Sequence, residues 1–299
     1  MLSATTEIRL YLLNSSWGEN GFCQGDKSTN YLMTKLRKRC DMTTLKKFSS
    51  NKEVYQTQEF DRWAYGNGLL PDEKYLIANY LDPSKKTVEA GTGGGRILLA
   101  MSKLGFTSLH GFDYLPEYIE VAKQRDVEGK INFQVQDATQ LNYEDCSFEQ
   151  ILYLCQMLSS IDDELGRLKA LKEAYRILKI GGTALFSFLS FDSRVSSVFY
   201  RPYLEYIRLL RKLRGSNLSI QYLPWLRFEN RPNLAALFDG GAHVYWYRLQ
   251  EAYQFLKDTN FDVVACGSRY QLSQGIIYES LANIANEPIK GMLYFVCKK

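Results

Sequence analysis

The sequence has few of the residues and patterns that mark several common protein classes. Only 2 histidines occur in 299 residues, so neither a histidine-rich metal site nor any other metal centre is expected. No stretch approaches about 18 apolar residues, so we expect no membrane-spanning helix and no membrane partner. The N-terminus lacks a basic region followed by a clean apolar core, so no secretory signal peptide is indicated.

Cysteine is sparse and shows no pairing pattern. The six cysteines are Cys23, Cys40, Cys146, Cys155, Cys266 and Cys297. Their spacing is typical neither of a disulfide framework nor of a zinc site. Reduced thiols are the simplest account, and we therefore expect a cytoplasmic protein.

Charge of one sign is not in large excess either. The net charge is +4, with 23% charged and 45% hydrophobic residues, which is close to the average of globular proteins. Large polyanion binders usually carry a stronger basic bias, so nucleic acid is not an expected partner. A basic cluster at residues 35–40 and 46–47 could still contact nucleic acid, although a solvated helix face is the commoner origin of such a cluster.

The most informative segment runs from residue 87 to residue 101. An apolar stretch precedes a glycine-rich turn, and an apolar run follows it, an order typical of strand, tight turn and helix. The turn contains three alternating glycines, Gly91, Gly93 and Gly95. Such a turn lets the backbone approach a ligand closely and points N–H groups at the start of the helix toward it. A glycine-rich turn without a ligand would give the same pattern.

Details of this turn separate it from two other nucleotide-binding loops. The dinucleotide fingerprint needs a third glycine at the position that Arg96 occupies. The phosphate-binding P-loop needs Lys followed by Ser or Thr, and neither follows here. Glu89 lies two residues before the first glycine, where a carboxylate would repel a pyrophosphate and would suit an amine.

The pattern from Glu89 to Gly95 resembles motif I of the class I S-adenosylmethionine-dependent methyltransferases. The resemblance covers about residues 60–299 and implies S-adenosylmethionine as the cofactor. It also implies an α/β, Rossmann-like, doubly wound sheet of seven strands with an antiparallel C-terminal hairpin. On this basis residues 1–60 form an N-terminal extension or cap, and residues 61–299 form the methyltransferase domain. Residues 191–241 are an inserted lid after the fifth strand.

Acidic residues end the next two expected strands. Residues 108–113 read as a strand that ends in Asp113, 18 residues after Gly95. The resemblance implies that Asp113 binds the ribose hydroxyls of the cofactor. The alternative role for Asp113 is a helix N-cap. Residues 131–138 alternate apolar and polar side chains and end in Asp137 and Ala138. By resemblance these two residues contact the adenine ring, with a turn-capping role as the alternative.

The resemblance completes a set of expected cofactor contacts. The fourth strand, residues 148–155, faces the methyl donor and acceptor at its end, which places Cys155 beside the cofactor and Gln156 beside the acceptor. A small buried cysteine is otherwise most often simple core. The expected cofactor-binding residues are Glu89, Gly91, Thr92, Gly93, Gly95, Asp113, Tyr114, Asp137, Ala138, Cys155 and Tyr65.

Later segments support the fold. A helical pattern from residue 168 runs to Gly181 and Gly182, which we expect to end the helix before a strand at 183–189. An amphipathic helix is expected at 248–258. Strands at 261–266 and 292–297 have no convincing helix between them, which favours an antiparallel pair.

Aromatic residues outside the common core are candidates for the acceptor site. Trp63 and Tyr65 precede the first strand and could cover the cofactor, or they could be ordinary core residues. In the insertion, residues 222–228 form an aromatic, irregular stretch that contains Trp225. By resemblance, substrate contacts are expected from Gln156, Tyr245, Trp246 and Trp225. His243 is the candidate general base, with a structural histidine as the alternative.

These observations predict an enzyme that moves a methyl group by a single in-line displacement. A small-molecule acceptor, methylated on oxygen or nitrogen, is the preferred hypothesis. A methyltransferase acting on RNA or protein is the second, although residues 155–158 lack the Asp/Asn-Pro-Pro-Tyr/Phe signature of nucleic-acid amino methylation. A non-catalytic S-adenosylmethionine-binding module is the third, and a nicotinamide oxidoreductase is disfavoured by Arg96 and the hairpin. No oligomeric state is predicted.

Overall fold

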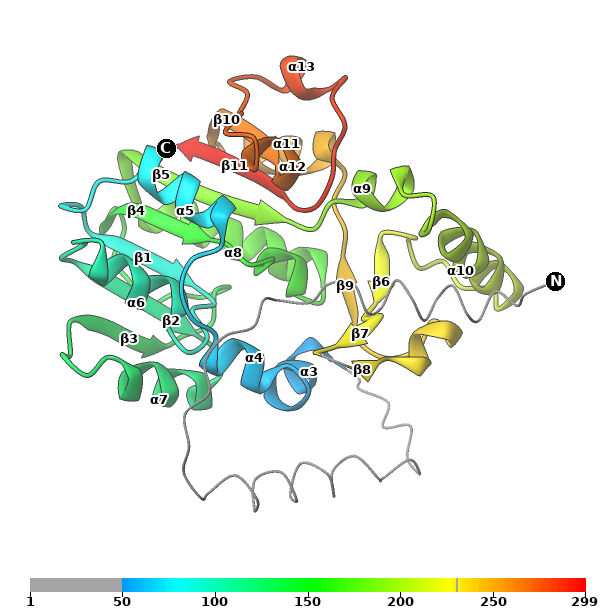
Figure 1. Cartoon of the computed structure of the whole chain (residues 1–299), viewed down its shortest axis with the longest axis horizontal. Coiled ribbons are helices and arrows are strands. Elements are labelled where there is room, and N and C mark those ends of the chain that lie inside the picture. Colours follow the sequence, from blue (N-terminus) through cyan, green and yellow to red (C-terminus); the bar gives the residue numbers. More distant parts are fainter. Residues whose placement is uncertain (1–49, 230) are drawn as a thin grey trace, which may run out of the picture. The chain divides into compact units, whose positions relative to one another are not determined.

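The computed structural model describes residues 50–229 and 231–299, whose largest element is a seven-stranded sheet (Figure 1). In chain order its strands are β1 Thr87–Ala90, β2 Leu109–Asp113, β3 Ile131–Val135, β4 Phe148–Tyr153, β5 Leu178–Phe188, β10 Asp262–Ser268 and β11 Leu293–Lys298. Their order across the sheet is β10-β11-β5-β4-β1-β2-β3. Strands β1 to β5 run parallel, whereas β11 is antiparallel to β5 and β10. The expected doubly wound sheet with an antiparallel C-terminal hairpin is confirmed.

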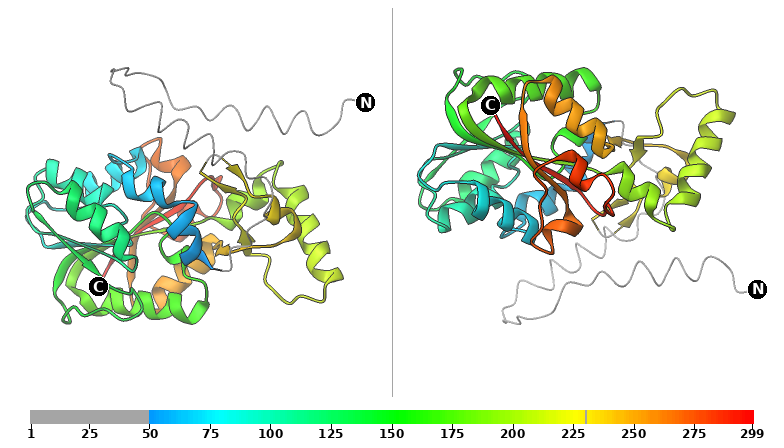
Figure 2. Two further views of the ribbon diagram at one scale, coloured as in Figure 1. Left: turned by 90° about the horizontal axis from the view of Figure 1, so that it is seen from below. Right: turned by 90° about the horizontal axis from the view of Figure 1, so that it is seen from above.

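Helices cover both faces of the sheet, because successive strand residues point to opposite apolar cores. One core includes residues of α8 (Glu164–Ile177) and α11 (Leu249–Asp258). The other includes residues of α5 (Pro71–Tyr80), α6 (Arg96–Lys103) and α7 (Pro116–Arg125). Figure 2 shows the resulting layers, with α8 on one side of the sheet and α6 and α7 on the other.

The strand order positions the site. Strands β1 and β4 are neighbours, although two strands and two helices separate them along the chain. The strand order therefore reverses at this point, and such a reversal opens a crevice at the carboxyl ends of the strands. The turns that leave β1 to β4 meet at that edge, which brings the glycine-rich turn, Asp113, Asp137 and Cys155 together.

One expectation about β5 is wrong. Gly181 and Gly182 do not end a helix, because α8 ends at Ile177 and β5 begins at Leu178. The pairing with β4 skips from Leu178 to Thr183, so the two glycines lie in a bulge. Gly181 has a φ of 75°, and a Cβ on Gly182 would lie 2.6 Å from Leu178 Cδ1. The bulge therefore explains why glycine occupies both positions, since Gly181 has a positive φ and Gly182 has no space for a side chain.

The predicted antiparallel pairing of the two C-terminal strands is confirmed. Strands β10 and β11 pair antiparallel along nearly their whole length. The segment between them contains two single-turn helices, α12 Arg269–Leu272 and α13 Leu281–Ile284, which the sequence did not indicate. Neither is long enough to return the chain for a parallel strand, a connection that needs a dozen or more residues.

The insertion between β5 and α11 forms its own small group of elements. It contains helix α9 Phe191–Ser196, helix α10 Arg201–Leu213, a 3₁₀ helix η2 Leu234–Phe238, the pair β6 Tyr222–Pro224 and β9 His243–Tyr245, and the pair β7 Arg227–Phe228 and β8 Arg231–Pro232. Residues 222–228 contain two short strands, so the prediction of an irregular stretch is wrong there.

Helices α3 Asn51–Thr57 and α4 Phe60–Tyr65 precede α5 and the sheet in the chain. They belong to the same compact unit as the sheet. The boundary expected at residue 60 therefore falls between two helices of that unit. The basic cluster at 35–47 lies outside the described residues. Within the described ranges, no helix combines the length and the apolar character needed to cross a bilayer.

Candidate active site

The turn after β1 places its alternating glycines in the left-handed region. Gly91, Gly93 and Gly95 have φ values of 64°, 53° and 78°. A Cβ on Gly93 would lie 2.9 Å from the Trp63 carbonyl oxygen, and a Cβ on Gly91 would lie 2.9 Å from Met157 Cγ. Both the backbone conformation and the close packing therefore require glycine here.

Gly94 ties this turn to α4. Its N–H donates to the Trp63 carbonyl at 3.0 Å, and a Cβ at this position would lie only 1.8 Å from the Ala64 carbonyl oxygen. The Arg125 guanidinium donates to the carbonyls of Ala64 and Gly94, at 2.7 Å each. Helix α4 is therefore fixed against the glycine turn at the carboxyl edge of the sheet.

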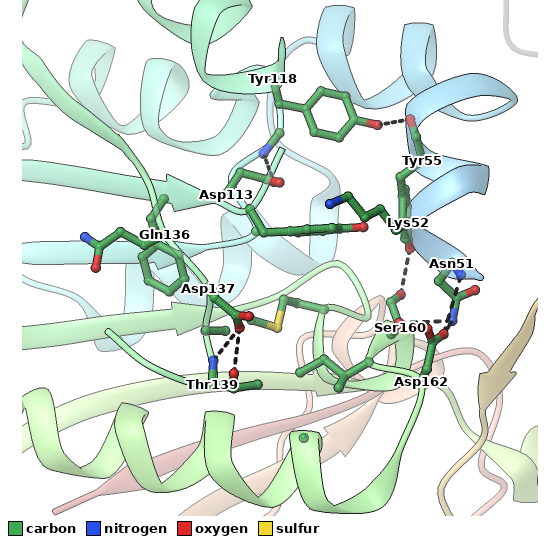
Figure 3. Close-up of a pocket in the computed structure, with 18 of the residues that line it drawn as sticks. Asn51, Lys52, Tyr55, Asp113, Tyr118, Gln136, Asp137, Thr139, Ser160 and Asp162 are labelled. Atoms are coloured by element: carbon green, nitrogen blue, oxygen red, sulfur yellow. Dashed lines mark hydrogen bonds between the residues drawn. The ribbon is translucent and has the colours of Figure 1, made fainter. Parts of the chain in front are cut away.

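Asp113 ends β2 with its carboxylate buried beside this turn (Figure 3). It accepts hydrogen bonds from the N–H groups of Gly93 at 3.0 Å and Leu115 at 3.1 Å. Burial raises the pKa of Asp113 to about 6, although these backbone donors oppose the rise. Leu115 is itself the N-cap residue of α7, so Asp113 is not that cap. A buried carboxylate at a cavity is a candidate partner for hydroxyl donors.

Glu89 lies within β1, just before the glycine turn. Its carboxylate accepts a hydrogen bond from Thr92 Oγ1 at 2.7 Å. Burial raises the pKa of Glu89 to about 8, although Thr92 and the nearby Arg96 oppose the rise. An approaching ammonium group would favour the charged carboxylate and lower this pKa.

Arg96, which separates this turn from a dinucleotide loop, has an intramolecular partner. It forms a bidentate pair with the buried Glu73, at 2.6 and 2.7 Å. Its guanidinium also lies 3.1 Å from Cys155 Sγ. This pairing fixes the start of α6 against α5 and the end of β4. No sequence motif indicated a role for Glu73.

The end of β4 has an unusual backbone. Cys155 and Gln156 adopt φ values of 54° and 59°, which is rare for residues other than glycine. The Gln156 N–H donates to Ser187 Oγ at 3.2 Å. Burial raises the pKa of the Cys155 thiol well above its usual range, so this cysteine is not a thiolate nucleophile.

A cavity of about 580 Å³ opens where these segments meet (Figure 3). Its volume lies within the range of roughly 300–1,000 Å³ that is common for small-molecule sites. It brings together the predicted residues Gly91, Gly93, Asp113, Tyr114, Asp137, Ala138 and Cys155. Glu89, Thr92 and Gly95 do not line it and instead lie behind its wall. Asp137 Oδ1 accepts from the Thr139 N–H and hydroxyl, both at 2.8 Å.

The other end of the cavity is built by residues that sequence reasoning missed. Tyr55 Oη and Ser160 Oγ are hydrogen-bonded at 2.6 Å. Asn51 Nδ2 donates to Asp162 Oδ1 at 2.7 Å and to the Ser160 carbonyl at 3.0 Å. Lys52 lines the same region (Figure 3). These residues come from α3 and from the loop before α8, and no motif marks either segment.

The pKa values of two side chains are also shifted at this end of the cavity. Burial raises the pKa of Tyr55 to about 12, which keeps its hydroxyl protonated at neutral pH. Burial also raises the pKa of Asp162, although the Asn51 amide and N–H oppose the rise. The cavity thus offers a neutral hydroxyl pair next to a carboxylate with increased basicity.

The two aromatic residues expected to cover the cofactor differ in position. Trp63 lines the cavity, and its Nε1 is a buried donor without a hydrogen-bond partner in the described residues. Tyr65 is 56% exposed, packs beside Phe60 and does not line the cavity. Tyr65 points away because α4 presents only one face to the glycine turn. The expectation for Tyr65 is therefore not supported.

His243 is not positioned as a general base. It does not line the cavity, and its Nε2 lies 3.2 Å from Asp239 Oδ1. Burial opposes ionisation of Asp239, yet Arg211 and His243 together lower the pKa of Asp239 to about 2. The His243 carbonyl accepts from Asn51 Nδ2 at 2.8 Å. The geometry favours the alternative of a structural histidine, because its ring is committed to an ion-pair network.

Three expected substrate residues, Tyr245, Trp246 and Gln156, also do not line the cavity. Tyr245 donates to Glu251 and stacks under the Arg167 guanidinium, 4.3 Å from its ring centre. The Trp246 ring packs 4.1 Å from the Arg194 guanidinium. Gln156 is partly buried beside Cys155 and likewise does not line the cavity.

Trp225 has a supporting position instead. Its Nε1 donates to Asn51 Oδ1 at 2.8 Å, and its ring centre lies 5.7 Å from that of Tyr55. The Glu229 N–H donates to Glu59 Oε1 at 2.6 Å. The insertion therefore braces α3 from outside, and α3 is the element that lines the cavity. Within the described ranges, no group of three or more His, Cys, Asp or Glu side chains is arranged to hold a metal ion.

Comparisons with known proteins agree with this geometry. Residues 88–186 match a family model described as a methyltransferase domain. A ubiquinone biosynthesis O-methyltransferase from Xanthomonas campestris is 25% identical over 185 residues, which cover 54% of this chain and 74% of that protein. A ubiquinone/menaquinone biosynthesis C-methyltransferase from Geobacter sp. is 30% identical over 145 residues, or 46% of this chain and 59% of that protein.

The fold has relatives among solved structures. A SAM-dependent methyltransferase from Methanosarcina mazei superposes with a TM-score of 0.56 at 20% identity, covering 75% of this chain and 96% of that one. The strand order and the glycine turn thus define a class I methyltransferase fold. Residues 88–186 therefore contain a methyltransferase domain, and the enzyme is an S-adenosylmethionine-dependent methyltransferase with S-adenosylmethionine as its cofactor.

Proposed function

We propose that this enzyme methylates an oxygen or nitrogen atom of a small molecule held at the α3 end of the cavity. The observation that carries the proposal is the continuity of one cavity of about 580 Å³ from the glycine turn to Tyr55 and Asp162. One end suits the cofactor, and the other offers polar groups that no cofactor role requires. The relatives named for O- and C-methylation in quinone biosynthesis agree with a small organic acceptor.

The cavity residues fit S-adenosylmethionine. Gly91 and Gly93 line the cavity with backbone alone, and Asp113 offers a buried carboxylate to the ribose hydroxyls. Asp137, Ala138 and Tyr114 line the same cavity, and we assign to them the contacts with the adenine ring. Trp63 Nε1 supplies an unused donor. When bound, the cofactor supplies a methyl group already activated on sulfonium sulfur.

The chain's own residues align and deprotonate the acceptor. Tyr55 and Ser160 form a hydroxyl pair that can fix an acceptor oxygen or nitrogen by hydrogen bonds. Asp162 takes the acceptor proton, because its pKa is raised by burial. Lys52 stabilises negative charge that develops on an acceptor oxygen. Asp162 replaces His243 in the base role.

Label transfer tests this proposal. The protein would be incubated with methyl-labelled S-adenosylmethionine and with three fractions of a cell extract: small molecules, total RNA and total protein. Label in the small-molecule fraction is expected, and Asp113→Ala should lose it while Asp258→Ala, an exposed control, should keep it. Label that enters only RNA or only protein would overturn the proposal and would favour a macromolecular acceptor.

A further inference from the structure

The insertion carries a band of exposed apolar side chains on α10 and η2. Exposed apolar side chains are common on their own, but a contiguous group on one protruding element usually marks a docking surface. The six side chains are between 42% and 75% exposed. We name them the apolar shelf: Tyr206, Leu209, Leu213, Leu234, Leu237 and Phe238.

Hydrogen bonds between the two elements make the apolar shelf continuous. Tyr206 Oη donates to the Leu237 carbonyl at 2.7 Å, and the Arg214 guanidinium donates to the Phe238 carbonyl at 2.8 Å. Tyr206, Leu209 and Leu213 recur at helical spacing, so they form one stripe along α10 next to η2. Figure 2 shows α10 at the far edge of the insertion, away from the seven-stranded sheet.

A basic stripe runs along the other exposed side of the same helix. Arg201, Arg208 and Lys212 are exposed and are spaced so that they share one helix face. Arg208 pairs with Glu205, the only carboxylate between residues 201 and 214. Helix α10 thus has three faces. One is packed against the insertion, one is apolar and exposed, and one is basic.

The C-terminal end of α10 adds a basic hollow. A surface depression of about 380 Å³ is lined by Arg208, Arg211, Lys212 and residues 215–218. Arg211 is neutralised by Asp239, whereas Lys212 has no ion-pair partner in the described residues. No residue of the apolar shelf lines the hollow, which opens on the basic side of α10. Its charge suits an anionic head group.

We propose that the apolar shelf and the basic stripe dock this enzyme on the surface of an anionic phospholipid bilayer. The pattern is that of an interfacial helix, with an apolar face toward the acyl boundary and Lys and Arg toward lipid phosphates. A symmetric dimer through the same surface would bring Arg201, Arg208 and Lys212 close to their own copies. The charge therefore favours a lipid surface. This proposal departs from the expectation of no membrane partner, and it requires no membrane-spanning helix.

Vesicle co-sedimentation tests the proposal on the full chain. The probes are vesicles of phosphatidylcholine alone and of phosphatidylcholine mixed with phosphatidylglycerol. The protein should pellet with the mixed vesicles and much less with the neutral ones, and added salt should weaken the binding. Leu209→Glu combined with Leu213→Glu should lower the affinity at least about tenfold, because buried apolar area is lost. Arg201→Gln combined with Lys212→Gln should lower it by about tenfold.

Matched controls separate docking from folding. Val127→Glu combined with Ile180→Glu changes two apolar side chains that are 90% and 86% exposed on the sheet domain, and it should bind vesicles like the parent. Lys74→Gln combined with Lys123→Gln is the charge control. Circular dichroism and S-adenosylmethionine binding verify folding of each variant. Absence of binding to the mixed vesicles by the folded parent would overturn the proposal. A stable dimer of the parent that is lost when Leu209→Glu and Leu213→Glu are combined would also overturn the proposal. A second copy of the chain would then cover the apolar shelf.

Discussion

The two ends of the cavity are built in different ways. At the cofactor end, the glycine turn, Asp113 and Asp137 each follow directly from the end of a neighbouring strand. At the acceptor end, Asn51 and Tyr55 from α3 contact Ser160 and Asp162, which lie more than 100 positions further along the chain. The first end depends on backbone conformation and strand order. The second depends on side-chain contacts between remote segments, and it can therefore vary without loss of the fold.

The comparison predicts that the two ends can be damaged separately. Asp162→Asn should lower kcat by about 100-fold or more, because a general base typically contributes at least that much. S-adenosylmethionine affinity, measured by calorimetry, should stay unchanged. The Asn51 hydrogen bond can be kept by the new amide oxygen, and Asp258→Asn serves as the control. An unchanged kcat with the acceptor found by labelling would remove Asp162 from the base role.

Gly93→Ala tests the cofactor end of the cavity. The new methyl group would meet the Trp63 carbonyl at 2.9 Å on a backbone with a φ of 53°. We expect the free energy of unfolding to fall by about 2 to 4 kcal/mol and cofactor affinity to fall by at least about tenfold. Gly129→Ala isolates the conformational part, since its φ is 63° and nothing lies within 4 Å. That control should cost only about 1 kcal/mol, measured by urea unfolding. Equal losses in the two variants would contradict close packing at Gly93.

Glu89 should link the cofactor end to pH. Its pKa is raised by burial from 4.5 to about 8, so the folded protein holds a proton that the unfolded chain releases. The contribution of Glu89 to stability should therefore be fully present below about pH 4.5 and should be lost as pH rises toward 8. Glu89→Gln should remove that fall and gain on the order of 1 kcal/mol or more near pH 8. Thermal unfolding across this range measures the effect. A parallel pH dependence in both proteins would assign the fall to another group.

His243→Gln should have the smallest effect. The His243 ring lies outside the cavity wall, and its contribution is one hydrogen bond to Asp239. We expect a loss of about 0.5 to 1.5 kcal/mol in unfolding free energy and a kcat within about twofold of the parent. Steady-state kinetics and urea unfolding provide the two measurements. A large kcat loss without a stability change would restore His243 as a catalytic residue.

Sequence reasoning was strongest where a residue's role follows from local chain geometry. The alternating glycines, the strand ends at Asp113 and Asp137, and the antiparallel hairpin each reflect a few neighbouring residues. It failed at Gly181 and Gly182, because a glycine pair is compatible with both a helix end and a strand bulge. Only the pairing of β5 with β4 distinguishes the two.

Aromatic side chains were harder to place than charged strand ends. Trp63 and Tyr65 are two positions apart, and only the packing of α4 on the glycine turn decides that Trp63 faces the cavity. Trp225, Tyr245 and Trp246 were expected at the acceptor, yet the first braces α3 and the other two pack on arginines. The aromatic character of these side chains predicts that they are buried, but it does not predict which part of the protein they pack against.

The sequence by itself determined the class of enzyme, the cofactor and the type of sheet, through the resemblance of its motifs to a known family. These motifs are short, so turn conformations and strand ends that a few neighbouring residues encode are enough to carry them. Only the tertiary structure decided the acceptor end. Asn51, Tyr55 and Asp162 acquire their roles through contacts across the chain, where burial shifts the pKa values of Tyr55 and Asp162. The same holds for the apolar shelf, because α10 leaves a stripe exposed only after its other face has packed.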